Sequence, residues 1–289
     1  MQRYSLLLLA SLLAGPVAAQ HEHGGTTPAA ATAHPWTRMP LLLPAGGRGE
    51  RAAAQVKAVG IAAEALSVHA PGGPPDARQR NFPLTAEGAK IASAAPSVGN
   101  YHWLVAREAS PELVKVASSV WYFGNPGPSP RALLGEPKHE LEIVPDPLPR
   151  EHGSYRESEK WRFVVRLHGQ PLAKQPLTLE TEFGTRTTFF TDSAGVATVL
   201  FPRDFRPPPA DAEGGRGGHG RPSAKFVLST ETDQGGQRFL TAFNLTYGPD
   251  PERGRSLAWG AAFCLAGMVA ATPLLRRRPG QPGKESRDA

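Results

Sequence analysis

The chain has 289 residues, of which 40% are hydrophobic and 20% charged, and its formal net charge is +6. This composition is sufficient for one large or two small domains with buried cores, and the 31 glycines and 30 prolines favour turns and short strands over long helices. Five basic residues against two acids lie in residues 276–289, so the remainder is nearly balanced. Because no basic stripe interleaved with aromatic residues appears there, the composition argues against a nucleic-acid partner.

Residues 1–19 have the pattern of a secretory signal peptide. Arg3 supplies the positive charge, Leu6 to Ala14 forms the apolar core, and Ala19 is a small residue at the cleavage position. The mature chain is therefore expected to begin near Gln20. Such a chain works in an oxidising compartment outside the cytoplasm.

Residues 20–38 are expected to be a flexible leader, and they contain the sharpest local signal in the chain. His21, Glu22 and His23 lie beside the cleavage site, and His34 follows later in the leader. Imidazole and carboxylate ligands suit Ni²⁺, Co²⁺, Cu²⁺ and Zn²⁺. We therefore predict a metal site at these four residues, with Ni²⁺ or Co²⁺ as the expected ion and Cu²⁺ or Zn²⁺ as alternatives.

The register of signal cleavage decides how strong this site would be. Cleavage after Gln20 makes His21 the first residue, and cleavage after Ala18 makes it the third, so both leave a free amine beside imidazoles. Cleavage after Ala19, the preferred position, leaves Gln20 first; this residue can cyclise, and His21 and His23 then remain as a weaker pair. In the other interpretation the leader is simply solvated and its histidines are incidental.

Residues 39–134 form a first β region of short strand-like runs separated by turn clusters. Residues 101–105 alternate between two strand faces. Tyr101, Trp103 and Val105 share one face, whereas His102 and Leu104 share the other. The alanine-rich stretch 52–66 also permits a helix. The predicted strands are Met39 to Leu43, Val56 to Val68, Ala89 to Ala94, Tyr101 to Arg107 and Leu113 to Phe123.

Residues 139–249 form a second β region with clearer alternation. Trp161, Phe163 and Val165 alternate with more polar residues, as expected of a strand with one buried face. A tight turn is predicted at Asp192 to Gly195, and the glycine-rich run 207–222 is expected to be a solvated loop. Several short antiparallel strands at this spacing predict a sandwich. The further predicted strands are Leu177 to Phe183, Thr185 to Phe190, Val196 to Phe201, Ala224 to Thr230 and Phe239 to Tyr247.

Neither region carries a catalytic signature. No G-x-S-x-G, H-E-x-x-H or phosphate-binding glycine loop appears, so we predict that the protein is not an enzyme. The pairs Glu140/Glu142 and Glu180/Glu182 are typical of solvated strand faces. Asn244 begins a glycosylation sequon to which we assign no role. The scattered histidines lack metal-ligand spacing and are expected to be surface or structurally satisfied side chains: His69, His102, His139, His152 and His168.

The apolar run from Leu257 to Leu275 contains 19 residues without a charge. As a helix it spans about 28 Å, close to the thickness of a bilayer core. Arginines 276–278 follow it, and positive residues stay on the cytoplasmic side. We therefore predict a single-pass inner-membrane protein with a C-terminal transmembrane helix, a periplasmic soluble part and a cytoplasmic tail, 276–289. A buried core helix is the alternative, although the glycines and proline of the run suit it poorly.

Four segments of the second region resemble the periplasmic family found beside bacterial cobalt and nickel uptake systems. Members of that family carry an L-E-I-V-P strand, a G-x-P-L-x-x-x-P-V strand pair and a T-D-x-x-G turn. The resemblance implies an immunoglobulin-like or prealbumin-like sandwich and a role in metal delivery. It also makes His34-Pro-Trp36 the counterpart of a histidine and aromatic residue near the family's mature N-terminus. The segments are Leu141 to Pro147, Trp161 to Leu172, Pro176 to Leu179 and Thr191 to Ala197.

Together these patterns predict an all-β protein of two sandwich-like regions with a C-terminal membrane helix. The only cysteine, Cys264, lies in the apolar run, so the exported part has no thiol ligand and no intrachain disulfide. The expected function is a non-enzymatic, membrane-anchored periplasmic accessory that binds nickel or cobalt or presents it to an uptake transporter. The alternative is a structural or adhesive envelope module that recognises protein or polymer without metal.

Overall fold

The computed structural model describes residues 35–45, 53–124, 126–149, 154–206, 222–251 and 257–275. By its contacts the chain divides into residues 1–35 and 36–289. The predicted signal peptide, the metal candidates His21, Glu22, His23 and His34, residues 207–221 of the glycine-rich run and the predicted cytoplasmic tail lie outside the described residues.

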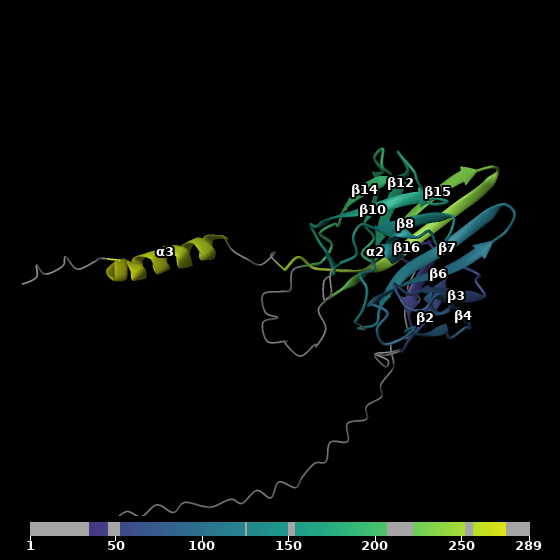
Figure 1. Ribbon diagram of the computed structural model, residues 1–289. Coiled ribbons are helices and arrows are strands. Elements are labelled where there is room, and N and C mark those ends of the chain that lie inside the picture. The colour runs from purple at the N-terminus through teal and green to yellow at the C-terminus, as the bar shows by residue number, and fades with distance from the viewer. Residues whose placement is uncertain are drawn as a thin grey trace, which may run out of the picture. The chain divides into compact units, whose positions relative to one another are not determined.

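Strands are the main regular structure of the described chain, as the sequence predicts (Figure 1). Short strands dominate because turn residues interrupt the chain every few residues. In chain order the elements are β1 (Leu41–Pro44), β2 (Ala53–Val59), β3 (Ala65–His69), α1 (Pro75–Arg78), β4 (Gln79–Pro83), β5 (Ala89–Ala92), β6 (Tyr101–Ala109), β7 (Leu113–Tyr122), α2 (Arg131–Gly135), β8 (Leu141–Pro145), β9 (Tyr155–Arg156), β10 (Lys160–Leu167), β11 (Gln170–Pro171), β12 (Pro176–Thr181), β13 (Arg186–Phe190), β14 (Val196–Leu200), β15 (Ala224–Gln234), β16 (Gln237–Gly248) and α3 (Leu257–Leu275).

One long sheet runs through both predicted β regions, in the order β13-β12-β15-β16-β7-β6-β3-β4, with β9 paired to β16. The two regions join where β16 pairs in parallel with β7, from Arg238 opposite Leu113 to Phe243 opposite Ser118. The two regions look separate in the sequence, because a pairing between strands so far apart leaves no local pattern. In the structure they share a backbone ladder.

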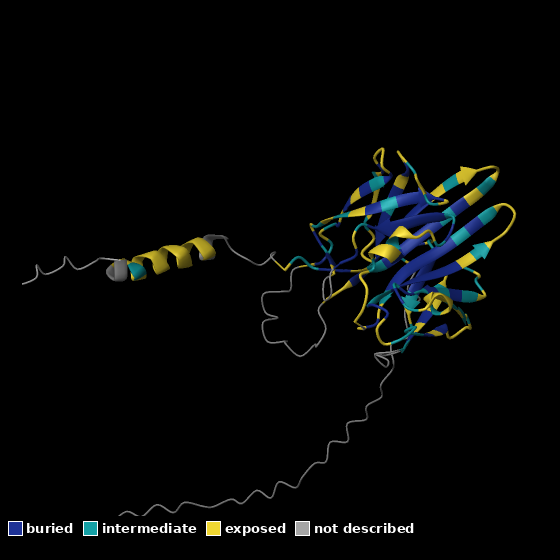
Figure 2. Cartoon of the chain, in the orientation of Figure 1, coloured by how far each residue is buried: buried dark blue, intermediate teal, exposed yellow. Residues whose placement is uncertain are grey.

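Two smaller sheets pack against the long sheet. Alternating residues of β6 pack into two different cores. Trp103 and Val105 belong to the core that contains Phe163 of β10. Leu104 belongs to the core that contains Ile91 of β5. This confirms the predicted division of the strand into two faces. The sheet of β1, β2 and β5 and the sheet of β8, β10, β11 and β14 therefore cover opposite faces of β6, and the middle strands are buried along most of their length (Figure 2).

Two local expectations are resolved by these strands. Residues 53–59 and 65–69 are strands, so the stretch 52–66 does not form the helix that its alanine content permits. The tight turn at Asp192 to Gly195 is confirmed: the Asp192 carboxylate accepts the backbone N–H groups of Ala194 and Val196 at 2.9 Å, and Gly195 has a φ of 73°. Because β13 and β14 belong to different sheets, this turn carries the chain across the sandwich.

The predicted C-terminal helix forms with the predicted bounds, Leu257–Leu275. Its large apolar side chains Phe263, Leu265, Met268 and Val269 are 61–74% exposed. Among the described residues, however, no helix is both long and apolar enough to cross a membrane.

Strand β1 is held by a side chain from the other end of the chain. The buried Asn244 on β16 accepts the Leu42 N–H through Oδ1 and donates to the Leu42 carbonyl through Nδ2, both at 2.8 Å. The amide thus bonds β1 as a neighbouring strand would. With its side chain buried and fully bonded, Asn244 fills a structural role, consistent with assigning the sequon no role.

We predict that Asn244→Ala lowers the free energy of unfolding by about 2–4 kcal/mol, because the substitution leaves two backbone groups of Leu42 buried without partners. Urea unfolding of the full chain in detergent measures this. The control is Asn81→Ala, since the exposed Asn81 only accepts a bond from Ser67; it should cost less than about 1 kcal/mol. Equal effects of the two substitutions would contradict the role assigned to Asn244.

Candidate functional site

The most highly charged buried part of the described chain lies where residues 136–140 lead from α2 into β8. Lys138 anchors this segment: its Nζ donates to the carbonyls of Leu133 and Glu136, and it lies 5.3 Å from the centre of the Trp103 ring. Burial lowers the pKa of Lys138 to about 8, and the nearby Glu142 opposes that shift. The lysine therefore ties the end of α2 to strand β6 of the long sheet.

A buried ion pair fixes the same segment from the opposite side. Glu142 on β8 has no exposed surface, and its Oε2 accepts a bond of 2.6 Å from Nε of Arg166 on the neighbouring strand β10. Its other oxygen accepts the Lys138 backbone N–H, while Arg166 also donates to the carbonyls of Gly135 and Glu136. The prediction that Glu142 lies on a solvated face is wrong, because strand alternation cannot show that a charged partner lies directly opposite.

Two histidines, His102 and His139, are buried near this junction or behind it, and His69 is half-buried. His69 lies opposite Trp103 in the β3–β6 ladder, and His139 lies at the start of β8 with 9% of its surface exposed. Burial lowers the pKa of each to about 4, and in His69 the nearby Lys138 and His139 add to the effect. His102 is fully buried on the other face of β6, 4.7 Å from the Phe123 ring. Burial lowers its pKa to about 4 as well, and the backbone of Asn100 opposes this only in part.

The ring nitrogens of His102 and His139 are buried without a hydrogen bond of normal geometry. The expectation of surface or satisfied histidines is therefore wrong for these two residues. Packing alone brings them inside, and the sequence contains no spacing signal that would have shown it. Both rings are neutral at pH 7, since their pKa values lie well below it.

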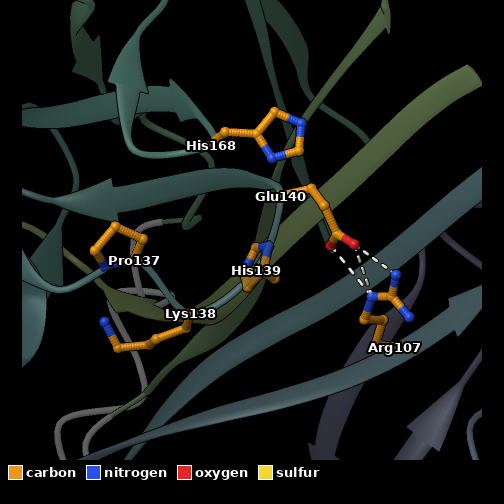
Figure 3. A pocket seen from close by; sticks show the side chains of 6 residues that line it. All are labelled: Arg107, Pro137, Lys138, His139, Glu140 and His168. Carbon is orange, nitrogen blue, oxygen red and sulfur yellow. Dashed lines mark hydrogen bonds and ion pairs between the residues drawn. The ribbon is translucent and has the colours of Figure 1, made fainter. Parts of the chain in front are cut away.

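A hollow of about 390 Å³ opens above the buried junction (Figure 3). Arg107 and Glu140 form an exposed ion pair in its lining, with Nε of Arg107 3.1 and 3.2 Å from the two carboxylate oxygens. Partial burial raises the pKa of Glu140, but hydrogen bonds from Arg107 and the backbone outweigh it and the net shift is downward. We call this hollow the junction pocket; its lining residues are Arg107, Pro137, Lys138, His139, Glu140 and His168.

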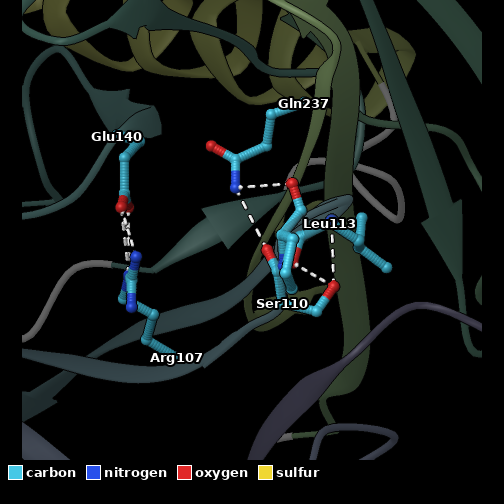
Figure 4. Close-up of polar contacts among 6 residues, drawn as sticks. Arg107, Ser110, Leu113, Glu140 and Gln237 are labelled. Carbon is cyan, nitrogen blue, oxygen red and sulfur yellow. Dashed lines mark hydrogen bonds and ion pairs between the residues drawn. The ribbon is translucent and has the colours of Figure 1, made fainter.

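Side-chain contacts hold the turns around the pocket in place. His168 sits at the turn between β10 and β11 with a φ of 49°, and its ring meets Phe239 edge to face at 5.7 Å. Near Arg107, Gln237 Nε2 donates to the Ser110 carbonyl at 3.1 Å (Figure 4). The β6–β7 turn is thereby tied to the start of β16. The pocket is thus lined from both predicted regions.

No three or more of the histidine, cysteine, aspartate and glutamate side chains in the described ranges are placed to hold a metal ion. His139, Glu140 and His168 share the pocket without forming such a set. Sequence reasoning missed Arg107, Lys138 and Arg166 altogether. The one available signal was a charge inside an apolar stretch of each of two strands, Glu142 in Leu141–Pro145 and Arg166 in the stretch Phe163 to Leu167 of β10.

The fold and this site define a β-sandwich protein with a buried ionic junction beneath a polar surface pocket. No protein-family model matches the chain, and neither does any curated protein at significant similarity. The resemblance to the family associated with cobalt and nickel uptake therefore stays a prediction.

Solved structures show only distant likeness. A Ca²⁺-stabilised adhesin with which an Antarctic bacterium binds ice and a 1.5-MDa bacterial ice-binding adhesin each share 9% identity with the chain, at a TM-score of 0.22. Both comparisons cover 73% of this chain, which spans 49% and 65% of those chains. The D0-D1 domain of intimin shares 14% identity at a TM-score of 0.23, covering 72% of this chain and 97% of that domain. Likeness at this level assigns no function.

We predict that Glu142→Ala destabilises the fold by about 3–5 kcal/mol, because it leaves Arg166 buried without its counter-charge. Glu140→Ala, two residues away, is the matched control; it removes only an exposed pair and should cost less than about 1 kcal/mol. Chemical unfolding of the full chain at pH 7 compares the two. Similar losses would show that Glu142 is not the structural partner.

We also predict that the protein loses stability as the pH falls from 6.5 to 4. In this window unfolded histidines bind protons that the buried His102 and His139 do not, so unfolding is favoured. Each contributes up to about 3 kcal/mol. His102→Leu should reduce the slope of unfolding free energy against pH between 6.5 and 4. An unchanged slope would contradict the assignment.

Proposed function

We propose that this protein is a non-enzymatic recognition module of the cell envelope that binds a polar polymer or protein through the junction pocket. The observation that carries the proposal is the pairing of an exposed, exchangeable ion pair with a rigid buried support. Arg107 and Glu140 are accessible, with 45% and 22% of their side-chain surfaces exposed, whereas Glu142 and Arg166 beneath them are almost completely buried.

An exposed ion pair contributes little to folding, because water competes for both partners. Arg107 and Glu140 can therefore exchange partners with a ligand at small cost. A guanidinium and a carboxylate side by side offer donors and acceptors that match carboxylate, amide and hydroxyl groups. The buried ion pair and the Lys138 contacts keep the pocket wall in place before a ligand arrives, which lowers the ordering cost of binding.

The residues of the junction support binding better than catalysis. The ring nitrogens of His139 are buried, although the residue contributes to the pocket wall. Glu142 is occupied by Arg166 and by the Lys138 backbone. A general base must lie within hydrogen-bond reach of the proton that it removes, and buried or occupied groups are poorly placed for this.

We further propose that the module is held at the membrane, because of the sequence patterns in residues 1–19 and 257–278. In this proposal the signal-peptide pattern would direct export, and the apolar run Leu257–Leu275 followed by arginines 276–278 would serve as a C-terminal inner-membrane anchor. The apolar side chains exposed on α3 support this location, because exposing them to water is unfavourable. The sandwich would then act in the periplasm.

We predict that Arg107→Ala weakens binding of the full chain to isolated cell-wall sacculi, or to envelope proteins immobilised from detergent extracts, by about tenfold. Co-sedimentation and pull-down measure the two cases. Arg162→Ala is the matched control, since Arg162 forms an exposed pair with Asp146 outside the pocket. Equal binding of both variants, or no binding by the wild-type chain, would contradict the proposal.

A second candidate function is metal capture by the leader, which is favoured by the sequence His21-Glu22-His23 beside the cleavage site. In this case the tether raises the effective concentration of Ni²⁺ or Co²⁺ near an uptake transporter. We predict that calorimetric titration of the mature full chain with Ni²⁺, Co²⁺, Cu²⁺ and Zn²⁺ detects binding that the double substitution His21→Ala/His23→Ala abolishes. His219→Ala is the control, because His219 belongs to the glycine-rich run 207–222 and not to the leader. Binding that survives the double substitution, or no binding at all, would eliminate this candidate.

A further inference from the structure

The two edges of the long sheet are treated differently. At one edge, β4 ends in Pro83, which has no N–H to offer a partner, and Arg80 on β4 donates to the Ala92 carbonyl of β5. Proline and a covering contact are common ways to protect a sheet edge. At the other edge, β13 pairs with β12, and none of the described strands pairs with its second side. Among the described strands of the long sheet, β13 is therefore the edge strand without such protection.

The backbone groups of β13 that face outward can be deduced from its bonds to β12. Thr181 N–H donates to the Thr185 carbonyl, and Thr191 N–H donates to the Gln175 carbonyl. In an antiparallel ladder the residues that bond to a neighbour alternate, so the odd-numbered residues of β13 face β12. The N–H and C=O groups of Arg186, Thr188 and Phe190 therefore point toward the open edge.

The side chains at these three positions share one face of the sheet. Oγ1 of Thr188 lies 3.1 Å from Oγ1 of Thr178, and Arg186 lies opposite Glu180. The contact between Arg186 and Glu180 is long, at 3.7 Å, and the Arg186 side chain is 70% exposed. Phe190 is 66% exposed, a large apolar side chain left uncovered at an unpaired edge. At one end of β13 Arg186 makes this long and exposed contact, and at the other end Phe190 is left largely uncovered.

We propose that β13 pairs antiparallel with β13 of a second copy of this chain, about a two-fold axis at Thr188. This register aligns the whole strand with itself and uses the outward backbone groups of all three residues. It places Thr188 opposite Thr188, and Arg186 of each copy opposite Phe190 of the other. The guanidinium then lies against the exposed aromatic ring, a favourable cation–π arrangement that is made twice.

The charges of the strand favour this register over those centred on Arg186 or Phe190. A two-fold axis at Arg186 would set two guanidinium groups directly opposite each other, which is unfavourable. An axis at Phe190 would leave Arg186 beyond the paired strand. The arrangement centred on Thr188 is the one in which both exposed end residues gain a complementary partner. The occupant is therefore a second copy of the chain.

The test is disulfide crosslinking of the full chain in membranes or mild detergent, in a Cys264→Ser background that removes the single native thiol. Thr188→Cys places two thiols at the axis, where directly opposite Cα atoms lie about 5.5 Å apart, within disulfide reach. Thr198→Cys, an exposed threonine on β14, is the matched control. We expect a covalent dimer from Thr188→Cys and not from Thr198→Cys.

A charge swap separates pairing from misfolding. In the Thr188→Cys background, Phe190→Arg sets arginines opposite each other and should reduce the crosslinked fraction by about tenfold or more. Adding Arg186→Phe restores the complementary pair with its members exchanged, so crosslinking should return. Absence of a Thr188→Cys dimer, equal crosslinking at Thr198, or failure of the double swap to restore the dimer would each overturn the proposal. None of these variants alters the junction pocket.

Discussion

The parallel ladder between β7 and β16 is the interaction on which the rest of the structure depends. It joins residues 113–118 to residues 238–243 and makes one sheet of strands from both halves of the chain. A parallel pair needs a long connection, and here the chain from α2 to β15 forms that connection. The segment between α2 and β8 crosses from the long sheet, which contains β7, to the smaller sheet, which contains β8, and residues 137–140 of this segment line the junction pocket.

The buried charges follow from that crossing. The segment 136–140 brings backbone carbonyls to a place where strands cannot bond them, so the side chains of Lys138 and Arg166 take over as donors. Glu142 then compensates the charge of Arg166 inside the sheet. Buried ion pairs add little net stability but are costly to break, so this cluster specifies a single arrangement of the junction. The pocket above it has a fixed wall and an exposed, exchangeable pair.

The sequence predicted the strands of this fold well, and the candidate site poorly. Alternation along Trp161 to Leu167 and along Tyr101 to Val105 identified the strands and their two faces, because side-chain direction is a local property of an extended chain. The same alternation placed Glu142 in solvent, because a pattern within one strand contains no information about Arg166 on the neighbouring strand. It also left Arg107 and Glu140 unconnected, because 33 residues separate them in the chain.

By itself, the sequence determined the all-β character, the tight turn at Asp192 to Gly195 and the helical run at Leu257–Leu275, each of which depends on residues within a few positions of one another. Tertiary structure alone decided that the two β regions share a sheet, that Asn244 holds β1, and that His102, His139 and Glu142 are buried. The physical reason is distance along the chain. Burial and pairing between remote strands depend on tertiary packing, and no periodic sequence pattern indicates which remote residues will pack together.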